Sequence, residues 1–172
     1  MISETAERKG QWEMAWKRWI LQSARTWDDV AGIIQLINIS EIDHDHMLFT
    51  QYALDLNLII QALNNQEASF ENLYKGDEIF QRLLDYAKIH FEHEKVIMEQ
   101  MKSPLMKAHL EQHAIFMKMI EDHYKEFKQG RLHIVSGLKL SVLDWWVNHI
   151  NGIDYQTFVV RNSHSGEEVH NE

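Results

Sequence analysis

The sequence predicts an all-α protein, an antiparallel up-down-up-down four-helix bundle with an additional N-terminal helix. Hydrophobic residues make up 45% of the chain, which has one proline, seven glycines and few β-branched runs, a composition that fits helices. A chain of 172 residues is long enough for one good core, and nothing in it suggests two. Three chain reversals, identified independently of the histidines, predict how the helices fold back on one another.

Five histidines and two carboxylates are spaced so that they lie at one level of such a bundle. Residues four apart share a helix face, and two pairs of these side chains have that spacing. The reversals that align them fall at natural breaks: the polar stretch 64–76, Pro104 and residues 129–131. The aligned residues are His46, His90, Glu94, His109, His113, His149 and Asp154. This coincidence predicts a metal site.

A helical extension and a connector precede the bundle. Residues 4–25 carry an amphipathic stripe of Trp12, Trp16, Trp19 and Ile20 at i, i+4, i+7 and i+8. We expect the stripe to pack against the protein rather than to form a partner interface. The connector that follows is expected to be buried through Ile33, Ile34, Leu36, Ile37 and Ile39.

Four long helices are expected after the connector. The first begins at Ser40 or Glu41 and runs to about Asn64, and the second begins near Asp77, a suitable N-cap. The second ends near residue 101, and the other two span roughly 105–129 and 133–158. We therefore divide the chain into an N-terminal helical extension (1–26), a bundle domain (27–161) and a polar tail or linker (162–172).

Charge and composition exclude several classes of protein. The formal net charge of −9 argues against nucleic acid or anionic lipid as the main partner. The absence of cysteine rules out disulfides, thiolate ligands, iron–sulfur clusters and cysteine catalysis. No apolar stretch approaches 18 residues, and residues 1–20 lack a signal-peptide core. We expect a soluble cytoplasmic protein with no membrane partner.

The candidate ligands suit two metal ions better than one. Imidazoles suit iron, copper or zinc, and carboxylates suit harder cations. Seven protein groups are too many for one tetrahedral zinc, but they suit two ions in five- to six-coordinate geometry with bridging carboxylates. One step is awkward: His149 and Asp154 are five residues apart, about 140° around an ideal α-helix. Spacing alone would not nominate Asp154.

The remaining histidines are interpreted as surface or hydrogen-bonded residues: His44, His93, His123, His133, His164 and His170. His44 and His93 are close in sequence to proposed ligands. Each should point away from the site if its neighbouring ligand points in.

The ligand pattern resembles the signature of the hemerythrin family, which includes bacteriohemerythrins and hemerythrin-like domains. The segments that carry the resemblance are His46, His90-Phe91-x-x-Glu94, His109-x-x-x-His113 and His149-Ile150-x-x-x-Asp154. Pro104, five residues before the third segment, also agrees, and the likeness covers about residues 27–158.

The resemblance implies a centre of two iron ions (Fe2+/Fe3+) with a bridging oxo or hydroxo group. It assigns His109, His113 and His149 to one iron, His46 and His90 to the other, and Glu94 and Asp154 to both as bridges. The iron with two histidines would keep an open position for O2, lined by Trp146 and Ile150.

Some features depart from the family pattern. The steps from His46 to His90 and from His113 to His149 are longer than in compact members. Asn38 stands where bacterial members usually have glycine, and Ser103 where a tyrosine often precedes the proline. We expect long helices or enlarged turns to absorb the extra length without moving the site.

Three functions stay open at this point. We rank first an O2-, NO- or redox-sensing domain of a signalling protein. The N-terminal helix with three tryptophans is more than a storage protein needs, and the tail 162–172 resembles a linker to a C-terminal output domain. A stand-alone O2 carrier or storage protein is second. A di-iron oxidase or peroxidase is last, because carboxylate-rich di-iron enzymes use more glutamates. We do not expect this domain itself to be an enzyme.

Overall fold

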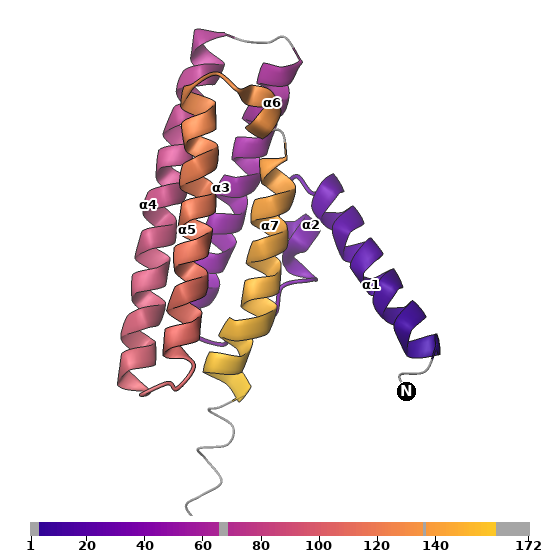
Figure 1. Cartoon of the computed structure of the whole chain (residues 1–172), viewed down its shortest axis with the longest axis vertical. Coiled ribbons are helices and arrows are strands. Elements are labelled where there is room, and N and C mark those ends of the chain that lie inside the picture. Colours follow the sequence, from indigo (N-terminus) through magenta and orange to yellow (C-terminus); the bar gives the residue numbers. More distant parts are fainter. Residues whose placement is uncertain (1–3, 66–68, 136, 161–172) are drawn as a thin grey trace, which may run out of the picture.

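Four long helical segments lie side by side along one axis (Figure 1). They are α3 (Ser40–Asn64), α4 (Phe70–Gln100), α5 (Met106–Lys128) and α7 (Leu138–His149), and α7 continues into a π-helix, η1 (Ile150–Val160). Helix α3 contacts α4 and α7, and α5 contacts the same two helices. The computed structural model describes residues 4–65, 69–135 and 137–160, and the regular structure in these ranges is all helical. The all-α bundle expected from the sequence is confirmed.

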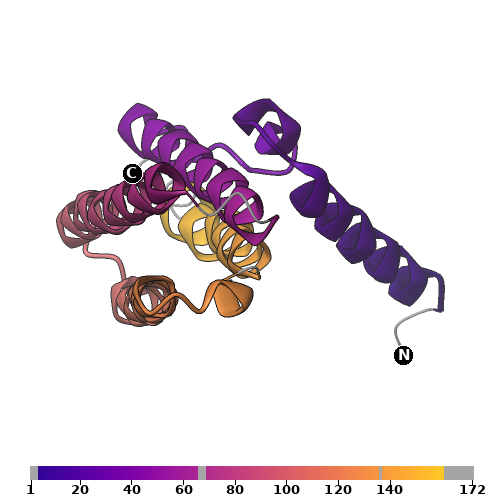
Figure 2. The same ribbon diagram turned by 90° about the horizontal axis from the view of Figure 1, so that it is seen from above.

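Three shorter or peripheral helices complete the described chain: α1 (Glu4–Ser23), α2 (Trp27–Ala31) and α6 (Leu132–Val135). Helix α1 lies outside the bundle and leans on it beside α7 (Figures 1 and 2). Lys139 of α7 fixes this contact, because its Nζ donates to the carbonyl oxygens of Gln22 (3.0 Å) and Ala24 (2.6 Å). Carbonyls at a helix C-terminus lack partners inside the helix and favour a cation. Lys139 therefore ties the end of α1 to α7.

The expected packing of the tryptophan stripe is wrong for the two tryptophans whose side chains the structure describes. Trp16 and Trp19 are 56% and 63% exposed, and the side chain of Trp12 lies outside the described residues. Helix α1 buries Leu21 near its C-terminal end, and Ala24, the first residue after the helix, is also buried. Helical spacing puts Leu21 and Ala24 on one face, with Trp16 to one side of it and Trp19 on the opposite face. The stripe identified an apolar face, but it could not tell which face α7 would cover.

The connector before α3 is buried only in part. Ile33, Ile34 and Ile37 are buried, whereas Leu36 is exposed, against expectation. The chain turns here because Asn38 has φ 63°, a left-handed conformation that asparagine tolerates better than most residues. Asn38 can therefore stand where bacterial members of the family usually have glycine, because both residues adopt this conformation. The Asp43 carboxylate accepts from the backbone N–H groups of residues 37 and 38 at 2.8 and 3.0 Å.

Helix α4 begins earlier than expected. It starts at Phe70 rather than near Asp77, and the hydroxyl of Ser69 accepts from the N–H of Asn72 (3.1 Å) as its N-cap. Asp77 lies inside the helix and accepts hydrogen bonds from Tyr124 and Lys128 of α5. A carboxylate that could serve as a cap is instead used to join two helices. The start of α3 and the reversal around Pro104 agree with the sequence.

The fourth helix is not the single α-helix expected over 133–158. The chain forms α6, then α7 with Gly137 at its N-cap, and then the π-helix η1. Within the described ranges, no helix is long and apolar enough to cross a membrane.

We predict that Gly76→Ala destabilises the bundle. A Cβ at this buried position would lie 2.6 Å from Cζ of Phe127, so α4 and α5 approach too closely for a side chain. Overpacking of this kind costs about 1–3 kcal/mol, although alanine is normally favoured over glycine inside a helix by about 1 kcal/mol. Urea unfolding under one metal condition measures the change.

Gly32→Ala is the matched control for Gly76→Ala. Position 32 has φ −70° and open space around its Cβ, so this change should leave stability unchanged or slightly higher. Equal stability of both variants would show that the α4–α5 distance does not depend on glycine.

Candidate metal centre

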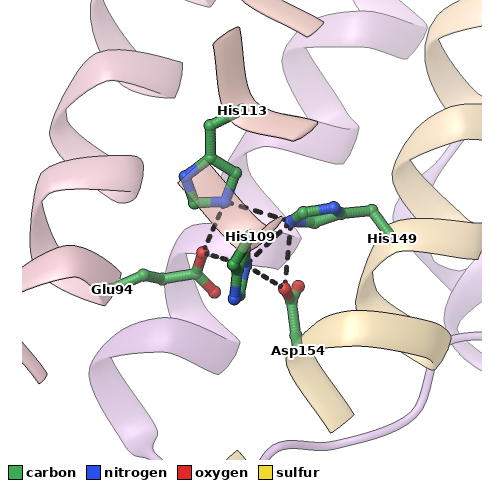
Figure 3. A group of neighbouring side chains, drawn as sticks. All are labelled: Glu94, His109, His113, His149 and Asp154. Carbon is green, nitrogen blue, oxygen red and sulfur yellow. Dashed lines mark hydrogen bonds and ion pairs between the residues drawn. The ribbon is translucent and has the colours of Figure 1, made fainter. Parts of the chain in front are cut away.

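The seven side chains singled out in the sequence come together inside the bundle. Their sources are α3 for His46, α4 for His90 and Glu94, α5 for His109 and His113, α7 for His149 and η1 for Asp154. All are buried, with at most 4% of the residue exposed. Figure 3 shows five of them, with the imidazoles directed at the two carboxylates. Every helix of the bundle contributes to this one cluster.

The seven residues form two groups that share Glu94. Glu94, His109, His113, His149 and Asp154 offer ligand atoms that lie within 4.8 Å of one another. His46, His90 and Glu94 form a second group by the same distance. Each group can hold one metal ion.

Glu94 faces both groups with different oxygens. Its Oε2 lies 3.3 Å from Nε2 of His109 and 3.0 Å from Nε2 of His113. Its Oε1 lies 3.7 Å from Nε2 of His90. A carboxylate placed in this way can give one oxygen to each of two metal ions.

Asp154 has the same arrangement. Its Oδ1 lies 2.8 Å from Nε2 of His109 and 3.0 Å from Nε2 of His149, and its Oδ2 lies 3.5 Å from Nε2 of His46. Both carboxylates are thus positioned as bridges between a group with three histidines and a group with two.

The π-helix accounts for the five-residue step that made Asp154 doubtful from its spacing. Helix α7 ends at His149 and η1 begins at the next residue. In a π-helix the backbone hydrogen bond joins residues five apart, so such residues lie one above the other, as residues four apart do in an α-helix. His149 and Asp154 therefore share a face. π-Helical segments are rare and often occur at functional sites.

The cluster leaves buried polar atoms without hydrogen-bond partners. They include both ring nitrogens of His46 and His90, and all four carboxylate oxygens of Glu94 and Asp154. Buried polar groups are normally paired, and leaving one unpaired costs roughly 1–3 kcal/mol. Nε2 of His149 also lies only 3.2 Å from that of His109 and 3.1 Å from that of His113. Donor atoms that converge in this way fit a bound cation.

Electrostatic interactions support the same conclusion. Burial alone would raise the pKa of both carboxyl groups, but the surrounding imidazoles hold the pKa of Glu94 and Asp154 well below the ordinary range. Burial opposes charge on His109, yet Asp154 and Glu94 raise its pKa to about 9. Burial lowers the pKa of His113 to about 4, despite the nearby Glu94. Without metal, His109 holds a proton at neutral pH, so metal binding should release it.

The two groups differ in the number of donors. The three-histidine group has five donors, counting one oxygen from each carboxylate, whereas the group of His46 and His90 has four by the same count. Trp146 and Ile150, the expected pocket residues, are both fully buried. The Trp146 ring lies 5.5 Å from the ring of His46 and 5.2 Å from that of His90. Trp146 therefore lies beside the group with fewer donors.

Sequence reasoning missed a hydrogen-bonded shell around the imidazoles. Asp45 is buried, and its Oδ1 accepts from the Tyr86 hydroxyl at 2.7 Å. Its Oδ2 lies 2.8 Å from Nδ1 of His93 and 3.5 Å from Nδ1 of His90. Burial would raise the pKa of Asp45, but these three partners outweigh it and lower the pKa to about 2. Asp45 is thus a permanent anion behind His90.

Two other imidazoles have neutral partners. Nδ1 of His149 donates to Oε1 of Gln112 (3.2 Å), and Nδ1 of His109 lies 3.3 Å from the Thr157 hydroxyl. Asp45 could have been suspected from the sequence because it is next to His46 on α3. The helical spacing of α3 does not show, however, that the Asp45 side chain reaches His90 on α4. Partners of this kind orient ligating imidazoles and tune their basicity.

The other histidines agree with the expectation where they are described. His44 is exposed and His123 half-buried, and neither joins the cluster. His93 points away from the two groups but binds Asp45, so it is a hydrogen-bonded residue. The side chains of His133, His164 and His170 lie outside the described residues.

Fold and site together define an all-helical protein with a buried histidine and carboxylate centre that can hold two metal ions. Bacteriohemerythrin of Stenotrophomonas maltophilia (strain R551-3) is 28% identical over 120 residues, which cover 69% of this chain and 71% of that protein. Bacteriohemerythrins of Pseudomonas aeruginosa (strain UCBPP-PA14) and Pseudomonas paraeruginosa are 26% identical over 113 residues, covering 58% of this chain and 73% of each relative.

No family model matches the chain, and no solved structure matches it. The curated relatives, at 26–28% identity, support a hemerythrin-like family for this chain, and the buried cluster fits a di-iron site.

We predict that Asp45→Ala weakens one of two metal-binding steps by about 10–100-fold, the usual effect of losing a partner of a ligating histidine. Asp45 stands behind His90 only, so the three-histidine group should keep its ion. Metal content after dialysis should fall from two ions per chain to about one.

Asp55→Ala is the control for Asp45→Ala, since Asp55 lies on the same helix and accepts a hydrogen bond from Gln51 away from the cluster. It should keep both ions. Loss of both ions in Asp45→Ala would mean that Asp45 supports the fold rather than one metal.

Proposed function

We propose that this chain is a non-heme di-iron protein that binds O2, or NO, at a histidine and carboxylate site inside an antiparallel up-down-up-down bundle. His109, His113 and His149 hold one iron, and His46 and His90 hold the other. Glu94 and Asp154 bridge them, together with an oxo or hydroxo group. The single observation that carries the proposal is the split of each carboxylate, with one oxygen toward each histidine group.

The diatomic ligand is assigned to the iron of His46 and His90. This group has fewer protein donors, and its neighbours Trp146 and Ile150 are fully buried. Iron supplies the redox chemistry that binds the diatomic reversibly. The protein supplies fixed imidazoles, two negative charges and an apolar surrounding that excludes water.

We assign the chain to O2 or redox sensing in a cytoplasmic signalling protein. Residues 1–26 form its N-terminal extension, residues 27–161 the bundle domain and residues 162–172 the tail. Support comes from α7, which carries His149, leads directly to Asp154 and holds the end of α1 through Lys139. A shift of the bridging carboxylate reaches α1 through one rigid element, which is the kind of physical link that signalling requires. An output domain joined to this chain would receive the signal through η1.

A stand-alone O2 carrier is the second candidate. The apolar enclosure of Trp146 and Ile150 favours it, because a carrier must keep water and protons from the adduct. A di-iron oxidase or peroxidase ranks last, because the cluster contains only two carboxylates, whereas the carboxylate-rich di-iron enzymes draw on several glutamates. We therefore propose no enzymatic activity for this domain.

The metal assignment predicts two irons per chain and an ultraviolet and visible spectrum of a bridged diferric centre when oxidised. His109→Ala should release iron and lower the melting temperature, since ligand binding to a buried site is also folding free energy. His123→Ala, on the same helix but away from the cluster, should do neither. A single zinc, or equal iron loss from both variants, contradicts the assignment.

Autoxidation separates sensor from carrier. A sensor of redox state is expected to lose its oxygenated form within minutes, with a change of hydrogen exchange in α1 between the reduced and oxidised states. Lys139→Met should abolish the change in α1 while leaving iron content at two per chain, because it removes only the link to α7. An oxygenated form that lasts for hours, with α1 indifferent to redox state, would support the carrier.

A further inference from the structure

The indole N–H of Trp146 is a buried donor without a partner. Trp146 is 0% exposed, and its Nε1 makes no hydrogen bond to any described residue. A buried indole normally has a hydrogen-bond partner, because leaving its N–H unpaired is unfavourable. Its isolation therefore needs an explanation.

The surroundings of Trp146 indicate where a partner would come from. Most of the rings packed against the indole cannot accept a conventional hydrogen bond; they are Phe49, Phe91, Phe116 and Trp145. The polar rings beside it are His46 and His90, which approach it edge-on. Both direct their Nε2 atoms at the bridging carboxylates. The polar side of the indole environment is thus the group with the open position.

We propose that the Trp146 N–H donates a hydrogen bond to the exogenous ligand on the metal of His46 and His90. This proposal rests on the function proposed above and adds a specificity-determining residue to it. An indole N–H donates but does not accept, and it carries no charge that changes with pH. It therefore favours ligands that bear negative charge on the atom remote from the metal, such as azide or an O2 molecule that has gained electron density. It gives little to a neutral, weak acceptor such as CO.

The neighbouring tryptophan provides a matched control. Trp145 is half-buried and stacks on His149, with ring centroids 4.2 Å apart and planes 16° apart. It also stacks on Phe116 at 4.0 Å. Trp145 lies beside the three-histidine group, which has five donors, so its N–H has no role at the open position.

The first experiment is an azide titration of the iron-loaded protein, followed by the visible charge-transfer band. Trp146→Phe keeps an aromatic ring and removes the N–H, so azide affinity should fall about tenfold, as for one lost hydrogen bond to an anion. Trp145→Phe should stay within about twofold of the unaltered protein. Unchanged azide affinity in Trp146→Phe overturns the proposal.

The second experiment uses the metal-free protein. Both Trp146→Phe and Trp146→Leu leave a cavity at a fully buried position, so some fall in the melting temperature is expected from lost packing alone, with the smaller fall in Trp146→Phe. The state of the donor is instead measured by NMR as the indole N–H signal that Trp146→Phe removes, and we expect the proton shift of a free N–H. The downfield shift of a hydrogen-bonded N–H in the metal-free protein would show that the protein itself satisfies Nε1, and would overturn the proposal. Trp146→Leu, which also lacks the donor, repeats the azide test if the phenylalanine variant does not fold.

Failure of the proposed function would be visible separately. Iron content and azide binding of the unaltered protein are measured first, and a chain without the second metal overturns both proposals at that step. A chain with two metals and normal azide binding in Trp146→Phe overturns only the role of Trp146.

Discussion

Two carboxylates buried in a helical core are the constraint on which the rest of the structure depends. Glu94 and Asp154 are fully enclosed and remain charged because five imidazoles surround them. Taking such charges out of water costs several kcal/mol each unless opposite charge is close by. Metal ions supply that charge most directly. The placement of α3, α4, α5 and α7 is set by the need to bring their histidines to the same two carboxylates.

Irregular features of the fold serve this placement. The change from α7 to the π-helix η1 turns Asp154 onto the face of His149, which an α-helix would not do. Gly76 lets α4 and α5 approach until the Phe127 ring touches the backbone of α4. These two helices carry the residues that share Glu94 Oε2.

The centre is asymmetric, because its two histidine groups differ in the number of protein donors and in their neighbours. The three-histidine group has five donors, and two of its imidazoles are held by neutral partners, Gln112 and Thr157. The other group has four donors, a carboxylate behind His90 and an enclosed indole beside it. The second group, with its smaller set of protein donors, is therefore the one that fits the ligand assignment proposed above. Lys139 joins α1 to the helix that carries His149, so the periphery is mechanically connected to the centre.

The sequence by itself determined the helical class and the core of the cluster, because the four-residue period of an α-helix is a local property that the pairs His90/Glu94 and His109/His113 display directly. The tertiary structure alone decided features that depend on contacts between helices. Asp77 became a link between α4 and α5 instead of a cap, and Asp45 proved to reach His90 across α3 and α4. Trp16 and Trp19 proved to be exposed, because an amphipathic pattern defines an apolar face without saying what covers it. The position of Asp154 was the hardest to predict, since local spacing assumes an α-helix and only the packed bundle stabilises a π-helix at that point.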